Sequence, residues 1–142
     1  MAEQLSVFLQ NESGKIASVA SLLAAGGIDI RALSIADTTD FGILRMLVSD
    51  ITAAKNVLSE QNCILSVNDV VVVAVPDAPG GLSRVLSLMA QEKIDIEYMY
   101  SLIERGVDVA YMVFRVSDEA KFTALLEAHG IQICSAEELG LK

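Results

Sequence analysis

The stretch GKIASVASLLAAGGIDI, residues 14–30, decides the fold because the chain repeats it as GGLSRVLSLMAQEKIDI at residues 80–96. The two copies align at an offset of 66 positions, which places Gly14 on Gly80, and they are identical at 8 of 17 positions. Further along the chain the offset becomes 68, so the second copy carries two extra residues in its hairpin. A duplication on this scale predicts two structural units built on one plan.

Each copy follows the same order of strand, turn, helix, strand, strand, helix and strand. Strands are predicted from short apolar runs, and the first helix of each copy from apolar residues that recur at spacings of three and four. In the first copy these helical positions are Ile16, Val19, Ala20 and Leu23. The other predicted segments are strands 5–9, 30–36, 42–48 and 63–67 with helix 52–61 in the first copy, and strands 70–75, 96–103, 107–116 and 131–134 with helix 118–129 in the second.

The repeated β-α-β-β-α-β order predicts an α+β protein. Two ferredoxin-like units would pack side by side, each an antiparallel sheet with helices on one face. We expect a first domain at residues 1–68, a second at 69–135 and a C-terminal tail at 136–142. The boundary has no linker rich in Gly, Pro or Ser, which favours packed units over tethered ones.

The third strand of each copy, residues 42–48 and 107–116, carries apolar side chains on both faces. A sheet with one wet face would alternate apolar and polar residues instead. Two interpretations stay open. Either the strands expose some aliphatic side chains, or a partner chain covers the helix-free face, which would make the protein a homodimer.

Composition excludes several functional classes. Of the 142 residues 53% are hydrophobic and 20% are charged, and the net charge of −9 disfavours binding to nucleic acid. No apolar run approaches the ~20 residues of a membrane span, and no secretion signal precedes residue 10, so the expected location is cytoplasmic. Cys63 and Cys134 fit no metal-binding spacing, and we expect free thiols with no metal and no cofactor.

The turn DAPGGL at residues 77–82, followed by IDI at 94–96, resembles the signature of the ACT domain family. That signature is an Asp/Asn-x-Pro-Gly-x-Leu turn after the first strand and a Gly-Ile-Asn/Asp-Ile run into the second. The first copy carries a weaker form, NESGKI at 11–16 and GIDI at 27–30. ACT domains are regulatory modules that usually bind amino acids and commonly pair into an eight-stranded sheet. The resemblance therefore implies a stand-alone tandem ACT protein without a catalytic domain.

The same turn suits a zwitterionic ligand on physical grounds. The first N–H groups of a helix lack intrahelical partners, and glycines at residues 80 and 81 would let a carboxylate approach those of Gly80, Gly81 and Leu82. Asp77 would accept from the ligand ammonium group. Two structural alternatives stay open: Asp77 could act only as a helix cap, and Gly14 and Gly80 could only permit contact between helix and sheet.

The candidate ligand-binding residues come from the two turns and from the second strands, whose edges would offer backbone groups to the same ligand. They are Asn11, Glu12, Ser13, Gly14, Ile35, Ala36, Asp77, Ala78, Pro79, Gly80, Gly81, Leu82, Ser101 and Leu102. The ligand would lie between the domains or across a homodimer.

The sequence gives no sign of an enzyme. Its single histidine, His129, precedes a glycine at a predicted helix end, where a structural role is favoured. No Cys or Ser has a spaced base, and no phosphate-binding loop is present. We expect a regulatory protein that binds an amino acid or a similar small molecule and could signal to an enzyme partner. The alternative is a ligand-free accessory subunit of an amino-acid metabolic enzyme or transporter.

Overall fold

The chain divides into two compact units in the computed structural model, which describes residues 1–10, 12–37 and 41–142. The N-terminal unit comprises Glu3–Asn68 and Gly140–Lys142. The C-terminal unit comprises Asp69–Leu139 and Met1–Ala2. The domain bounds predicted from the repeat, 1–68 and 69–135 with a separate tail, stay a prediction.

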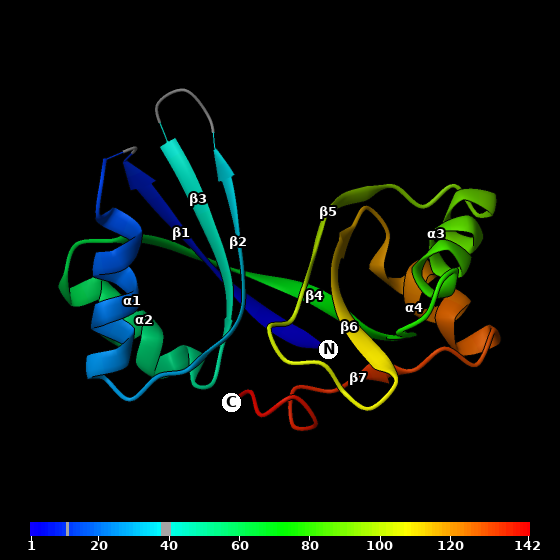
Figure 1. Ribbon diagram of the computed structural model, residues 1–142. Helices are drawn as coiled ribbons and strands as arrows, with labels where there is room; N and C mark the ends of the chain where they lie inside the picture. Colours follow the sequence, from blue (N-terminus) through cyan, green and yellow to red (C-terminus); the bar gives the residue numbers. More distant parts are fainter. Residues whose placement is uncertain (11, 38–40) are drawn as a thin grey trace. The chain divides into compact units, whose positions relative to one another are not determined.

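The N-terminal unit is an antiparallel sheet with strand order β2-β3-β1-β4 and two helices on one face (Figure 1). Its elements are β1 Ala2–Gln10, α1 Lys15–Ala25, β2 Ile30–Asp37, β3 Phe41–Val48, α2 Ile51–Glu60 and the first part of β4 Ile64–Pro76. Alternate residues of β1 and β3 meet the helices in its core, which includes Leu5, Val7, Leu44 and Met46 with Val19, Leu23 and Leu58.

The C-terminal unit repeats this plan. The rest of β4 is followed by α3 Gly81–Gln91, β5 Ile96–Ser101, β6 Val109–Val116, α4 Glu119–Ala128 and the short β7 Ile133–Cys134. Its strands are ordered β5-β6-β4-β7, and its helices again share one face of the sheet (Figure 1). Phe114 and Phe122 meet edge to face in its core. The α+β class and the repeated βαββαβ order are therefore confirmed.

The identical Ile-Asp-Ile runs make the same backbone clasp in both units. In the N-terminal unit the Asp29 amide donates to the Ser49 hydroxyl at 2.9 Å, and the Ser49 amide donates to the Asp29 carbonyl at 2.9 Å. Asp95 and Ser117 repeat both bonds at 3.2 and 3.0 Å. The clasp ties the start of the second strand to the end of the third and satisfies backbone groups that neither strand pairs.

Glycine in the left-handed conformation starts the first helix of each unit. Gly14 has φ +86° and Gly80 has φ +89°, and each is the N-cap residue without a side-chain cap. The interpretation of Asp77 as a cap is therefore wrong, because Asp77 lies three residues before Gly80. The contact interpretation of these glycines is also wrong, since a Cβ at either position would meet no atom within 4 Å.

Two predicted strand bounds are corrected by the structure. Residues 63–67 and 70–75 were expected as separate strands, but β4 runs through Asn68 and Asp69 without a break. Both residues keep extended backbone, because Asn68 accepts from Ser6 at 3.2 Å and the Asp69 carbonyl accepts from Arg115 at 2.8 Å.

The hairpin of the C-terminal unit is longer than predicted. Strands were expected to reach Ile103 and to resume at Val107, but β5 ends at Ser101 and β6 begins at Val109. Asp108 has φ +58°, which an extended strand cannot contain, and Val107 is 89% exposed.

Ile16 was predicted to lie on the buried face of α1, and that prediction is wrong. Ile16 is 40% exposed in the first turn of the helix, whereas Val19 and Leu23 are buried. The apolar face is therefore shorter than the periodicity indicates, and Ile16 is available to line a surface groove.

We expect Gly80→Ala to lower the free energy of unfolding by about 1–2 kcal/mol, because an L-residue is strained in the left-handed region. Gly80→Asn should cost less, since asparagine tolerates that region. Gly14→Ala, its repeat counterpart, should behave like Gly80→Ala. Urea unfolding followed by circular dichroism measures all three, and a Gly80→Ala variant as stable as the parent would contradict the assignment.

Candidate functional site

The described part of the chain offers no cluster of metal-ligating side chains. No group of three His, Cys, Asp or Glu side chains in it could hold a metal ion. None of the described helices has the length and the apolar character that a membrane crossing requires. Candidate sites in the described residues are surface grooves, and two of those in the N-terminal unit are lined by Lys15.

The first groove, here called the Glu12 groove, lies where β1 passes into α1. Its volume is about 350 Å³. It is lined by Leu9 and Gln10 of β1, by Glu12, Ser13, Lys15 and Ile16 around the helix start, by Ile35 and Asp37 of β2, and by Gly42 and Leu44 of β3.

Charges of both signs line the Glu12 groove. Lys15 and Glu12 form an ion pair with 3.8 Å between Nζ and Oε2, and both side chains are about half exposed. Asp37 adds a second carboxylate at the end of β2. Ile16 and Ile35 supply an apolar surface beside these charges. The groove therefore offers a cation, two anions and an apolar wall within one small volume.

Sequence reasoning found part of this groove. Three predicted residues, Glu12, Ser13 and Ile35, line it together, and Gly14 is the adjacent N-cap. Ala36 does not line it, because neighbouring residues of a strand point to opposite faces of the sheet. Asn11 lies outside the described residues.

Lys15 and Asp37 were missed as site residues. Lys15 stands next to Gly14 in the same turn but is not among the predicted site residues. Asp37 follows Ile35 by two positions and therefore points to the same side of β2. That strand periodicity was the signal that could have identified Asp37.

The turn of the C-terminal unit is arranged differently from the prediction. Asp77 pairs with Arg105, with 3.0 Å between Oδ2 and Nη1, and so already has a cationic partner. The Gly81 amide donates to the Ala78 carbonyl at 3.0 Å, and a Cβ at Gly81 would collide with the Pro76 carbonyl oxygen. Gly81 therefore permits close backbone packing, and the prediction that its amide is open to a carboxylate is wrong.

The remaining predicted residues of the C-terminal unit lie around this turn. Ala78 and Pro79 are exposed in the loop, and Leu82 packs against the core. Ser101 is exposed at the end of β5. Leu102 is buried, and its amide donates to the Tyr111 carbonyl at 3.0 Å, so that amide is already satisfied.

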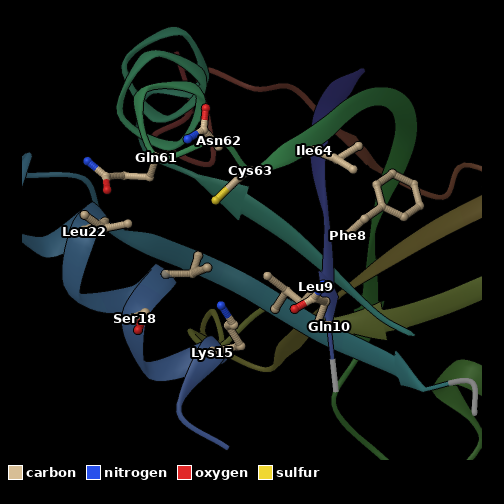
Figure 2. A pocket seen from close by; sticks show the side chains of 11 residues that line it. Phe8, Leu9, Gln10, Lys15, Ser18, Leu22, Gln61, Asn62, Cys63 and Ile64 are labelled. Carbon is tan, nitrogen blue, oxygen red and sulfur yellow. The ribbon is translucent and has the colours of Figure 1, made fainter. Parts of the chain in front are cut away.

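The second groove, here called the Cys63 groove, lies beside the end of β1 and has a volume of about 440 Å³. It is lined by residues 8–10 of β1, by one face of α1 that carries Lys15 and Ser18, and by residues 61–64. Figure 2 shows the Cys63 sulfur and the Lys15 ammonium nitrogen pointing into the same space from opposite sides. Sequence reasoning predicted no site here.

Cys134 contrasts with Cys63. Both are free thiols, but Cys134 is buried in β7. Burial raises the pKa of the Cys134 thiol, and the nearby carboxylate of Glu138 raises it further. That carboxylate is held in place by Gln132 and Ser135, whose side chains donate to it at 3.1 and 3.2 Å.

Comparison with known proteins places these observations in context. A family model described as "ACT domain pair" matches residues 1–140. The crystal structure of protein BT0572 from Bacteroides thetaiotaomicron is 38% identical to the chain, has a TM-score of 0.90, and is matched over 98% of this chain and 95% of that one. No curated protein sequence matches significantly.

The fold also resembles the ligand-free regulatory subunit of aspartate kinase from Thermus thermophilus. That structure has a TM-score of 0.63 and is matched over 90% of this chain and 91% of its own. The sequence identity is 18%, so this likeness concerns the fold alone.

The raised pKa of Cys134 predicts a loss of stability at alkaline pH. The unfolded chain gives up this proton at a lower pH than the folded chain. The contribution of the Cys134 thiol to the free energy of unfolding is therefore complete below the ordinary thiol pKa of about 8.5 and falls as the pH rises above it. Relative to Cys134→Ala, the parent should lose up to about 1.4 kcal/mol of unfolding free energy per pH unit above that point.

Urea unfolding at several values between about pH 8 and pH 10 measures this difference. Cys63→Ala is the control for the removal of a thiol elsewhere in the chain. Parallel profiles for the parent and Cys134→Ala would contradict the assignment.

Proposed function

Because the chain belongs to the ACT domain family as an ACT domain pair, we propose that it is a regulatory protein that binds an amino acid in the Glu12 groove. The presence of both charge signs in that groove carries the proposal. A zwitterion needs an anionic and a cationic partner a few ångströms apart. A groove that holds only one sign would leave one end of the ligand without a partner, at the cost of its desolvation.

In the proposed complex, Lys15 binds the ligand carboxylate, and Glu12 and Asp37 accept from the ligand ammonium group. The ligand takes over the two ends of the Glu12–Lys15 ion pair, which is weak in the free protein because both side chains are about half exposed. An aliphatic ligand side chain would lie against Ile16 and Ile35, both of which are exposed without it.

The N-terminal unit fits this ligand better than the C-terminal unit. At the offset of 66, Glu12 and Lys15 are replaced by Ala78 and Gly81, and Asp37 by Ile103. The remaining acid of that turn, Asp77, is paired with Arg105. We therefore propose that the first copy binds the amino acid, although its turn matches the family signature less well.

The proposed mechanism is linkage between binding and conformation. A ligand held by Glu12, Lys15 and Asp37 ties the start of α1 to the end of β2 and so favours arrangements in which the two are close. If an enzyme partner binds that arrangement preferentially, its binding depends on the ligand concentration. The predicted homodimer, in which a partner chain covers the helix-free face of the sheet, stays a prediction.

The alternative is an accessory subunit that binds no ligand and uses its ACT pair only for assembly. The exposed apolar residues Ile35 and Phe41 favour this alternative, because they would suit a protein contact as well as a ligand. The two functions differ in whether any amino acid stabilises the protein.

We expect at least one of the twenty amino acids to raise the melting temperature of the protein. A ligand at a hundred times its dissociation constant adds about 2.7 kcal/mol to the unfolding free energy. Glu12→Gln should weaken that ligand by about tenfold, because a charged hydrogen bond to the ammonium group is lost. Thermal-shift assays followed by calorimetry on the active compound measure both effects.

Glu60→Gln is the matched control, since Glu60 is exposed at the end of α2 and does not line the groove. It should leave the affinity unchanged. Stabilisation by no amino acid would favour the accessory subunit, and equal losses in Glu12→Gln and Glu60→Gln would exclude the Glu12 groove.

A further inference from the structure

The Cys63 groove has a counterpart in the C-terminal unit, and the two grooves differ in size. The counterpart of the Cys63 groove in the C-terminal unit lies beside Pro76, Gly81 and Gly130 and has a volume of about 230 Å³, against about 440 Å³ for the Cys63 groove. The repeat aligns Ile131 with Cys63 and Gly130 with Asn62. The groove at this position in the fold is therefore larger in the N-terminal unit.

Arg84 is one difference between the two grooves. It lies on α3 at the position that Ser18 occupies on α1, and it lines the smaller groove. Its guanidinium donates to the His129 carbonyl at 3.4 Å, which joins α3 to the end of α4 across the opening. Ser18 is too short to make such a bridge to Gln61, the counterpart of His129.

The open groove has a consistent chemistry. Lys15 carries the only charge among its described lining residues, and no carboxylate stands among them. Gln10, Ser18 and Asn62 provide neutral polar groups, and Leu9, Leu22 and Ile64 provide apolar surface. A ligand ammonium group would find no anionic partner there, whereas a carboxylate would find the Lys15 ammonium group.

We propose that the Cys63 groove is a second ligand site, selective for a small monocarboxylate that has an apolar body and no ammonium group. The carboxylate pairs with Lys15, and the apolar body lies against Leu9, Leu22 and Ile64. A volume of about 440 Å³ lies in the usual range of small-molecule sites. The Glu12 groove, which adds carboxylates to the same lysine, takes a zwitterion instead. The proposed amino-acid site is not needed for this inference.

Cys63 provides a local reporter for this proposal because its thiol points into the groove (Figure 2). The probe is 3-phenylpropanoate, compared with phenylalanine, which adds an ammonium group, and with 3-phenylpropanol, which lacks the charge. Alkylation of Cys63 by iodoacetamide is followed by mass spectrometry. Cys134 is 1% exposed and serves as the internal reference for unfolding.

We expect 3-phenylpropanoate at ten times its dissociation constant to slow alkylation of Cys63 about elevenfold, and phenylalanine and 3-phenylpropanol to protect it far less. Ser18→Arg, which copies the arginine of the smaller groove in the C-terminal unit, should abolish the protection. Lys15→Met should raise the dissociation constant about tenfold through loss of the charged partner. Lys55→Met, at an exposed position of α2, should leave the dissociation constant unchanged.

Three results would overturn the proposal: no protection by 3-phenylpropanoate, equal protection by all three compounds, or protection that persists in Ser18→Arg. Circular dichroism checks that Ser18→Arg folds, and if it does not, Lys15→Met decides between the outcomes. Cys63 and Ser18 do not line the Glu12 groove, so a failure here is separable from a failure of amino-acid binding there.

Discussion

A glycine held in the left-handed conformation at the start of the first helix is the constraint on which both units depend. With φ near +86° at Gly14 and +89° at Gly80, the chain turns from the first strand into the helix without any side-chain cap. The second helices differ, because Asp50 and Asp118 cap them through their side chains. Since glycine makes the turn alone, the residues around it are released from capping and can take other roles.

The two copies use that freedom differently. In the N-terminal unit the turn carries Glu12 and Lys15, which pair only weakly and face a groove. In the C-terminal unit Asp77 is paired with Arg105 from the longer β5–β6 hairpin. The two extra residues of the second copy fall in that hairpin. The insertion therefore lengthens the hairpin that carries Arg105, the partner of Asp77. The same fold thus has charged side chains that face a groove at the helix start of one copy, and an acidic side chain paired with an arginine at the helix start of the other.

The sequence predicts features that depend on local pattern or on the repeat. Apolar periodicity and the repeat predict the element order, and the backbone clasp between Asp29 and Ser49 recurs between Asp95 and Ser117. The sequence does not predict contacts between residues that are far apart in the chain. Asp77 and Arg105 are 28 positions apart, and no local pattern shows that they pair. The continuity of β4 was missed because Asn and Asp are common in turns, and the hydrogen bonds that Ser6 and Arg115 donate to Asn68 and Asp69 come from residues far away in the sequence.

Lys15 connects the two grooves of the N-terminal unit because it lines both. One ammonium group cannot form a strong ion pair with a ligand carboxylate in both grooves at the same time. A carboxylate that pairs with Lys15 in the Cys63 groove occupies the ammonium group that the Glu12 groove also uses, and so leaves Glu12 and Asp37 as the uncompensated charges of the Glu12 groove. An amino acid would then lose the partner of its carboxylate, so the two ligands would oppose each other. Thermodynamic linkage requires that opposition to be equal in both directions. If both proposed sites bind, the protein would respond to the ratio of an amino acid to a deaminated acid, and a single side chain would make that comparison.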